Sequence, residues 1–235
     1  VTANGTANDG GVKVAATDNT KISGGSGGAA IAVVGTGGAV NVNDITKSTL
    51  AYIGQNADVL NAGNTDIIAK SNEQSYNVTV QAVGGAVGLA GAVAVHNFDV
   101  LTKAYADSGV DILDADGFIE SITGGKVTVE AEHQIGINST TVGANISGIS
   151  IGAAVDVGTI ISQTNAYIGD GANVTTAGDV EVKATEKDKD FTYKKRDDNG
   201  EETNEVKTAT KMESNAVAGS VGGATVSGSV SVYTF

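Results

Sequence analysis

Cysteine, proline and tryptophan are all absent from this chain of 235 residues. Without cysteine the chain can form no disulfide, no thiolate zinc site and no cysteine nucleophile. Without proline no interior strand loses a backbone donor, so the composition is compatible with long, uninterrupted β-ladders. No window of a dozen residues sustains the apolar spacing of an amphipathic helix. These absences favour an all-β protein.

Large apolar residues and basic residues are scarce as well. The chain has only 4 phenylalanines against 33 glycines, so we expect a thin, finely interdigitated core in which glycine punctuates the strands. The glycines do not follow the collagen triplet, and frequent V-x-V alternation argues against disorder. With 14 basic and 27 acidic residues, the net charge of -13 repels nucleic acid and anionic lipid, so neither is expected as a partner.

Valine pairs mark the expected strands, because they alternate with the two-residue period of a β-strand. The pairs are Val12/Val14, Val40/Val42, Val93/Val95, Val127/Val129, Val180/Val182 and Val230/Val232. The longest uncharged stretch, 75–96, is interrupted by glycine and polar residues and has strand-like ends. We therefore expect no membrane insertion by this segment.

One sequence unit recurs along the chain, which is typical of solenoids and arrays. Each unit opens on a strand of small residues, carries an Ala-Tyr pair and closes on a second strand. The units are 38–90, 91–152 and 153–227, with partial units 1–37 and 228–235, and the Ala-Tyr pairs are 51–52, 104–105 and 166–167. The tyrosine could form a carbohydrate-stacking row. We favour a ring that packs coil on coil and caps the core.

The unit starts lie 53, 62 and 75 residues apart, and the extra residues fall within 106–124 and 186–213. Since the register elsewhere is kept, we expect both insertions to loop out of a conserved cross-section. A unit of short strands and turns predicts a parallel β-helix, with two or three coils per unit. A β-sandwich or barrel is the structural alternative. It is disfavoured because no Asn-Gly hairpin turn joins the units.

A family resemblance lies in the stretch 166–184, which reads Ala-Tyr-Ile-Gly-Asp-Gly-Ala-Asn-Val and then Gly-Asp-Val-Glu-Val-Lys-Ala. It resembles the repeats of giant secreted bacterial exoproteins, most of all leukotoxin-type adhesins related to filamentous haemagglutinin, and covers nearly the whole chain. The resemblance implies a right-handed parallel β-helix, export by type V secretion, and attachment to a protein or glycan receptor on host cells or other bacteria. The start and end of the chain suggest an excised segment of a longer protein.

The insertion 186–213 is rich in charges of both signs and predicts an extruded β-hairpin. A type I′ turn on Asn199-Gly200 would pair Tyr193 with Val206 and Phe191 with Thr208. The candidate partner-binding residues are Phe191, Tyr193, Lys194, Lys195 and Arg196, which gather aromatic and basic side chains on an acidic chain. The alternative is a solvated flap without a binding role.

The acidic residues of the insertion within 106–124 do not have the spacing of a metal site. Asp114-Ala115-Asp116-Gly117 is similar to part of a calcium loop, but that frame puts Ile112 and Thr123 where calcium needs carboxylates. A polar surface loop is the better interpretation, and we expect no metal and no cofactor.

The two histidines, His96 and His133, lack any triad signature, and we expect them to be surface or satisfied structural residues. Without catalytic residues, the chain is expected to act as the shaft and partner-binding segment of a bacterial adhesin, secreted or on the cell surface. A leukotoxin-like cytotoxic effector is the alternative. A polysaccharide-active β-helix enzyme is less favoured, because such an enzyme needs several charged side chains that converge in one groove.

Overall fold

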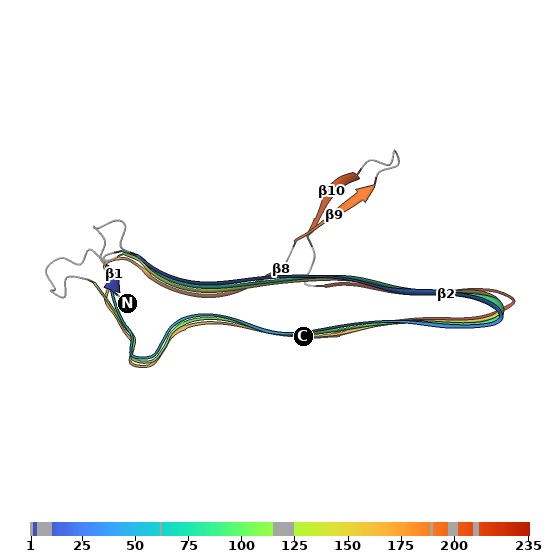
Figure 1. The fold of residues 1–235 in the computed structure, drawn as a ribbon, viewed down its shortest axis with the longest axis horizontal. Coiled ribbons are helices and arrows are strands. Elements are labelled where there is room, and N and C mark those ends of the chain that lie inside the picture. The colour runs from blue at the N-terminus through green and yellow to red at the C-terminus, as the bar shows by residue number, and fades with distance from the viewer. Residues whose placement is uncertain are drawn as a thin grey trace.

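The protein is all-β, and its architecture is a parallel β-solenoid (Figure 1). The computed structural model describes residues 2–3, 11–61, 63–114, 125–188, 190–196, 202–208 and 212–235, and no helix occurs among them. Because the long strands pair in parallel in an open stack, the sandwich and barrel alternatives do not apply.

Three strands of 42 residues each run almost all the way around one coil, namely β2 (Val12–Ile53), β4 (Thr65–Ala106) and β6 (Val127–Ile168). A fourth, incomplete coil lies on β6 and consists of β8 (Val180–Asp188), β11 (Met212–Val221) and β12 (Ala224–Thr234). A second parallel sheet is formed by β1 (Thr2–Ala3), β3 (Asp58–Asn61), β5 (Asp111–Asp114) and β7 (Asn173–Val174).

Each coil is a long, flat loop of two layers (Figure 1). In the first coil, residues 12–32 form the upper layer, the chain turns at Val33, and residues 34–53 return as the lower layer. We call the turn end the tip and the opposite end, which carries β1 and the other short strands, the base. The turns of the later coils occupy the matching positions Ala86, Gly148 and 222–223.

The strand register follows the predicted alignment of the units. Gly38 pairs with Gly91, Gly91 with Ala153, and Ala153 with Gly228. One unit therefore makes one coil, and the expectation of two or three coils per unit is wrong. The physical reason is that small inward side chains let the two layers run side by side for about twenty residues before any turn is needed.

The core changes character from base to tip. Near the base, inward side chains are apolar and include Ile67, Val129 and Ala131, followed by a smaller cluster around Phe98 and Ile137. Toward the tip the inward residues of the upper layer become mainly serine, threonine, asparagine and glycine, and those of the lower layer are mainly alanine. A Cβ on the inward Gly143 would lie 2.1 Å from the carbonyl oxygen of Ala153 in the opposite layer. Glycine thus lets the two backbones touch, which explains the thin core.

Both insertions lie outside the regular coil. In the second unit, β5 still pairs with β3 and Val127 pairs with Thr65, so the extra residues lie between Asp114 and Val127. In the third unit, Asp188 pairs with Ile135 and Met212 with Ile137, so residues 189–211 replace the single residue Gly136. They carry the antiparallel hairpin of β9 (Asp190–Arg196) and β10 (Glu202–Thr208), which projects from the upper layer (Figure 1).

Candidate interaction surfaces and buried polar clusters

The β9–β10 hairpin holds all five predicted partner-binding residues on one strand. Phe191, Tyr193, Lys194, Lys195 and Arg196 all lie in β9. Their side chains lie outside the part of the chain that the structure describes. For these five residues the structure therefore gives only the order along β9 and the backbone pairs with β10.

The predicted register of the hairpin is wrong by one residue. Tyr193 pairs with Glu205 rather than Val206, and Phe191 pairs with Lys207 rather than Thr208. The last pair is Arg196 with Glu202, and the odd number of residues between them is incompatible with a two-residue turn on Asn199-Gly200.

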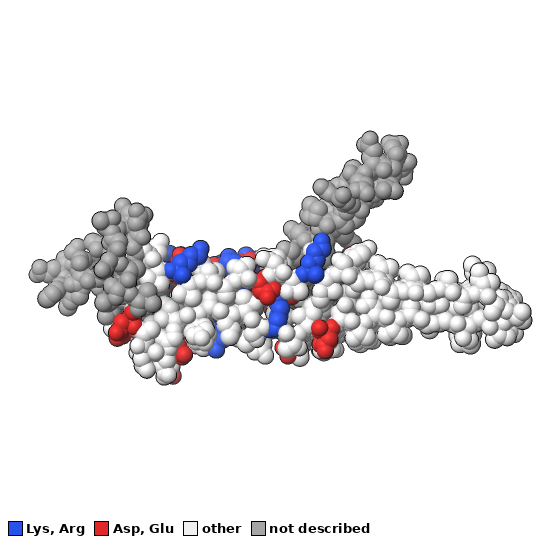
Figure 2. Space-filling view, in the orientation of Figure 1, with Lys and Arg blue, Asp and Glu red and all other residues white. Residues whose placement is uncertain are grey.

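Each of the four coils contains a long uncharged segment toward the tip. The segments 22–43, 75–95, 134–155 and 214–235 contain no Asp, Glu, Lys or Arg, and together they form what we call the tip half. Figure 2 shows this division, with red and blue residues toward the base and none at the tip. In the upper layer of the tip half the usual polarity is inverted: Ser75, Asn77 and Thr79 point inward and are buried, whereas Val80 is exposed.

The outer side of the lower layer is a regular array of apolar rows, which we call the valine face. Paired residues of the four coils make the rows Val34–Val87–Ile149–Ala224, Thr36–Leu89–Ile151–Val226, Val40–Val93–Val155–Val230 and Val42–Val95–Val157–Val232. Between the second and third rows runs a trough of small residues, Gly38–Gly91–Ala153–Gly228. The side chains are accessible, since Val40 is 61% exposed and Val226 is 66% exposed.

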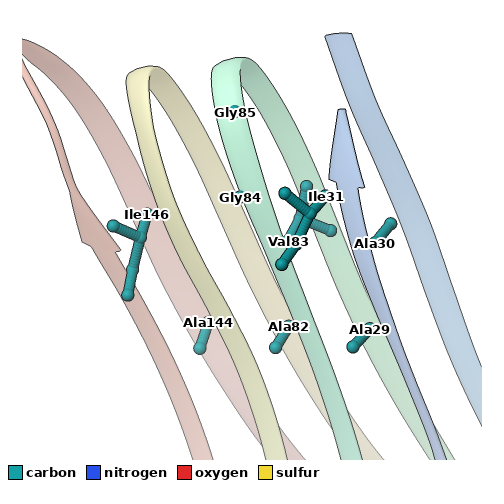
Figure 3. Close-up of a pocket in the computed structure, with 9 residues that line it drawn as sticks. All are labelled: Ala29, Ala30, Ile31, Ala82, Val83, Gly84, Gly85, Ala144 and Ile146. Carbon is teal, nitrogen blue, oxygen red and sulfur yellow. The ribbon is translucent and has the colours of Figure 1, made fainter. Parts of the chain in front are cut away.

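The outer side of the upper layer carries a shallow apolar groove near the tip. Gly84 pairs with Ile31 on one side and Ile146 on the other, so a glycine stands between two isoleucines (Figure 3). The space has a volume of about 370 Å³, and it is lined only by alanine, glycine, valine and isoleucine. Figure 3 shows Ala82 and Ala144 at the same end of the groove. The groove offers an apolar ligand contact area but no polar group to orient it.

The Ala-Tyr positions form a continuous row of stacked rings. The Tyr52 and Tyr105 ring centroids are 5.0 Å apart, those of Tyr105 and Tyr167 are 5.1 Å apart, and Lys103 Nζ lies 4.4 Å from the Tyr105 centroid. The rings thus pack coil on coil, but on the outer surface rather than as caps on the core, because Tyr52 is half exposed. Stacking between tyrosines occupies the ring faces that a sugar would need, which disfavours the carbohydrate row.

His133 lies in a buried polar cluster near the middle of the coil. Its Nε2 is 2.5 Å from Glu73 Oε2 and its Nδ1 is 2.6 Å from Ser162 Oγ. Ser71 and Lys47 also contact the Glu73 carboxylate. Burial disfavours the charged form of Glu73, but the contacts with His133, Lys47 and Ser71 outweigh it and hold the pKa of Glu73 below its usual value.

The order serine, histidine, carboxylate matches a catalytic triad, yet the surroundings do not. The His133 side chain has no exposed surface, because it lies between the two layers of the coil stack. A general base must lie within reach of a substrate proton. The cluster therefore fits a structural role, in which the imidazole satisfies a buried carboxylate.

His96 lies in a second buried cluster, between Asn43, Ser139 and Asp156. Its Nδ1 is 3.1 Å from Asn43 Nδ2 and its Nε2 is 3.0 Å from Ser139 Oγ and 3.4 Å from Asp156 Oδ1. Asp156 also accepts hydrogen bonds of 2.7 Å each from Tyr233 and Ser214. Burial opposes ionisation, but these bonds keep the pKa of Asp156 below its usual value. Burial and the Asp156 carboxylate raise the pKa of Tyr233.

Both histidines are thus satisfied structural residues, one of the two placements expected from the sequence. The alignment of the units could have predicted one of these contacts. It places His96, Gly158 and Tyr233 at equivalent positions of successive coils, and therefore side by side. An added Cβ on Gly158 would lie 2.0 Å from the Tyr233 ring, so the glycine makes room for that ring.

The acidic insertion is only partly described. Asp107 accepts a 2.8 Å hydrogen bond from the Ser108 backbone, and Asp111 and Asp114 lie in β5, whereas Asp116 and Glu120 lie outside the described residues. Within the described ranges, no three His, Asp or Glu side chains gather so as to hold a metal ion. The same residues include no helix with the length and apolarity to cross a membrane. No protein-family model, curated protein or solved structure matches the chain.

Proposed function

We propose that this chain is a segment of the shaft of a bacterial adhesin, secreted or displayed on the cell surface, and that it also carries a partner-binding element. The observation that supports this function best is the in-register stacking of one sequence unit per coil. Such a stack lengthens by adding units without changing its cross-section, which is what a shaft requires. The resemblance of 166–184 to repeats of filamentous adhesins supports the same proposal. The function needs neither catalysis nor a cofactor.

The partner-binding element in this proposal is the β9–β10 hairpin. It is inserted at one position of the fourth coil, where the third coil has only Gly136, so the stack does not require it. Its sequence Phe191 to Arg196 combines two aromatic residues with three basic ones on a chain whose net charge is -13. Aromatic residues and arginine are the types that dominate binding energy at protein interfaces. The partner is a protein or glycan receptor on a host cell or another bacterium.

The test is to replace residues 189–211 by a single glycine, which gives the fourth coil the spacing of the third. We expect the circular dichroism of the solenoid to be kept and the adhesion of coated beads to host cells or bacteria to be lost. A matched pair of variants narrows the site: Tyr193→Ser should weaken adhesion, whereas Thr192→Ser on the same strand should not. Full adhesion by the shortened chain would exclude the hairpin as the binding element.

A cytotoxic role is the competing function, and the exposed apolar tip is the feature that favours it. Ile31 is 91% exposed and Val33 is 79% exposed. Purified chain applied to leukocytes distinguishes the two functions. Adherence without release of a cytosolic enzyme supports the adhesin, and dose-dependent release would support the effector.

A further inference from the structure

The valine face has the composition of a surface that is buried against a partner. Its four rows hold valine, leucine and isoleucine at almost every position, and no charged residue lies among them. The trough between the rows is open, because a Cβ on Gly91 or Gly228 would meet no heavy atom within 4 Å. Ridges of side chains beside an empty trough are the form that lets two sheets interdigitate.

The area of the face suits a protein interface. Four coils spaced by about 4.8 Å give a width of about 19 Å, and nine strand positions, 34–42, give a length of about 30 Å. The face therefore covers about 570 Å² on one molecule, or about 1,100 Å² when two such faces meet, which is above the roughly 1,000 Å² expected of a biological interface and in the range of weak ones. It is also as large as the largest apolar patch of a typical monomer, about 300–600 Å².

The position of the face favours a flat partner over an irregular one. The upper layer cannot stack flat on another sheet, because the β9–β10 hairpin projects from it (Figure 1). The described lower layer has no insertion: β2, β4 and β6 continue unbroken from the tip toward the base, and β12 lies alongside β6 as far as Thr159. The valine face has no charged group that could form an ion pair with a charged partner. A second valine face, in contrast, has ridges and a trough of the same shape.

We propose that the valine face is a self-association surface, and that its occupant is the valine face of a second copy of this chain. A two-fold axis that lies in the interface plane, perpendicular to the strands, places the two tips at opposite ends, so that the tip halves overlap and the charged base halves lie apart. This arrangement keeps the acidic residues of the two copies away from each other. The inference stands independently of the receptor-binding role of the hairpin.

The experiment is sedimentation equilibrium of the whole 235-residue chain over a range of concentrations. We expect a monomer–dimer equilibrium. Val93→Lys, at the centre of the face, should weaken the dimer by about ten-fold or more, because a buried lysine would have no partner. The matched control is Ala82→Lys, which adds the same charge to the outer side of the upper layer in the same coil and should leave the dimer unchanged.

Circular dichroism shows whether each variant folds, and Gly91→Lys supplies a second test because its Cβ has open space. A chain that stays monomeric at all concentrations would overturn the proposal. Equal weakening by Val93→Lys and Ala82→Lys would overturn it too. Binding of a monomeric chain to phosphatidylcholine vesicles, lost in Val93→Lys, would identify lipid as the occupant instead.

Discussion

Replacing Gly143 by alanine tests whether the two layers of the coil touch in the tip half. Gly143 faces inward from the upper layer, and an added Cβ would lie 2.1 Å from the Ala153 carbonyl oxygen and 2.9 Å from its carbonyl carbon. Ordinary Cβ contacts begin at 3.4 Å, and the obstacle is backbone, so the layers must move apart by about 1 Å. The movement also stretches the 3.2 Å hydrogen bond from Asn145 to the Ile151 carbonyl, which joins the two layers.

The expected cost can be worked from these contacts. Overpacking of this kind destabilises a protein by about 1–3 kcal/mol. Alanine recovers about 0.4–1 kcal/mol by restricting the unfolded chain, which leaves a net loss of roughly 0–2.6 kcal/mol in the free energy of unfolding. At about 2–4 °C per kcal/mol for a chain of this size, the midpoint of thermal unfolding should fall by up to about 10 °C.

The matched control is Gly91→Ala, on the outer side of the lower layer, where an added Cβ meets no heavy atom within 4 Å. Its unfolding midpoint should be unchanged or slightly higher, because only the unfolded-state term remains. Thermal unfolding followed by circular dichroism measures both variants. If Gly143→Ala were as stable as Gly91→Ala, the close contact between layers would be refuted.

Two further predictions concern the buried clusters and the tyrosine row. Because the pKa of Asp156 is lowered in the folded chain, its carboxylate stabilises the fold above the unfolded-state pKa, and this contribution is lost as the pH falls through the folded pKa. Thermal unfolding between about pH 7 and pH 2 should therefore show a smaller loss of stability in Asp156→Asn than in the wild type, and equal losses would contradict this. Tyr105→Ala removes two ring contacts at about 0.5–1.5 kcal/mol each and the contact with Lys103, so it should cost at least about twice as much as Tyr52→Ala, which removes one ring contact. Equal costs in urea unfolding would argue against the stacked row.

The register of the solenoid could be predicted from the sequence, but the shape of the coil could not. The start positions Gly38, Gly91, Ala153 and Gly228 align because the same alternation of small residues and valine recurs in every unit. Inward and outward side chains alternate in the same way in one long flat coil as in several short coils, so the alternation does not predict the number of coils per unit. Glycine was expected to punctuate strands, whereas Gly143 lies inside a continuous strand and serves close contact between layers.

The buried polar side chains of the tip half could not be located from the sequence, because its upper layer inverts the usual rule that apolar side chains point inward. Applied to 75–83, that rule would put Val78 and Val80 inside and Asn77 outside, whereas Asn77 is fully buried and Val80 is exposed. The inversion depends on how closely the layers approach, since mainly small side chains fit between them, polar residues and glycine from the upper layer and alanine from the lower layer. The charges of 186–213 were enough to predict a hairpin. Its register depends on whether the loop between β9 and β10 has an odd or an even number of residues.

The distance between equivalent residues of different units tests the one-coil-per-unit arrangement most directly. Cysteine is absent, so Val40→Cys and Val230→Cys place nitroxide labels on two exposed positions, which are 61% and 52% accessible in the native chain. One coil per unit separates these positions by three coil spacings, or about 14 Å, which dipolar broadening of the electron paramagnetic resonance spectrum detects. A separation of about 29 Å or more, expected for two or three coils per unit, would contradict the fold and remove the valine face with it.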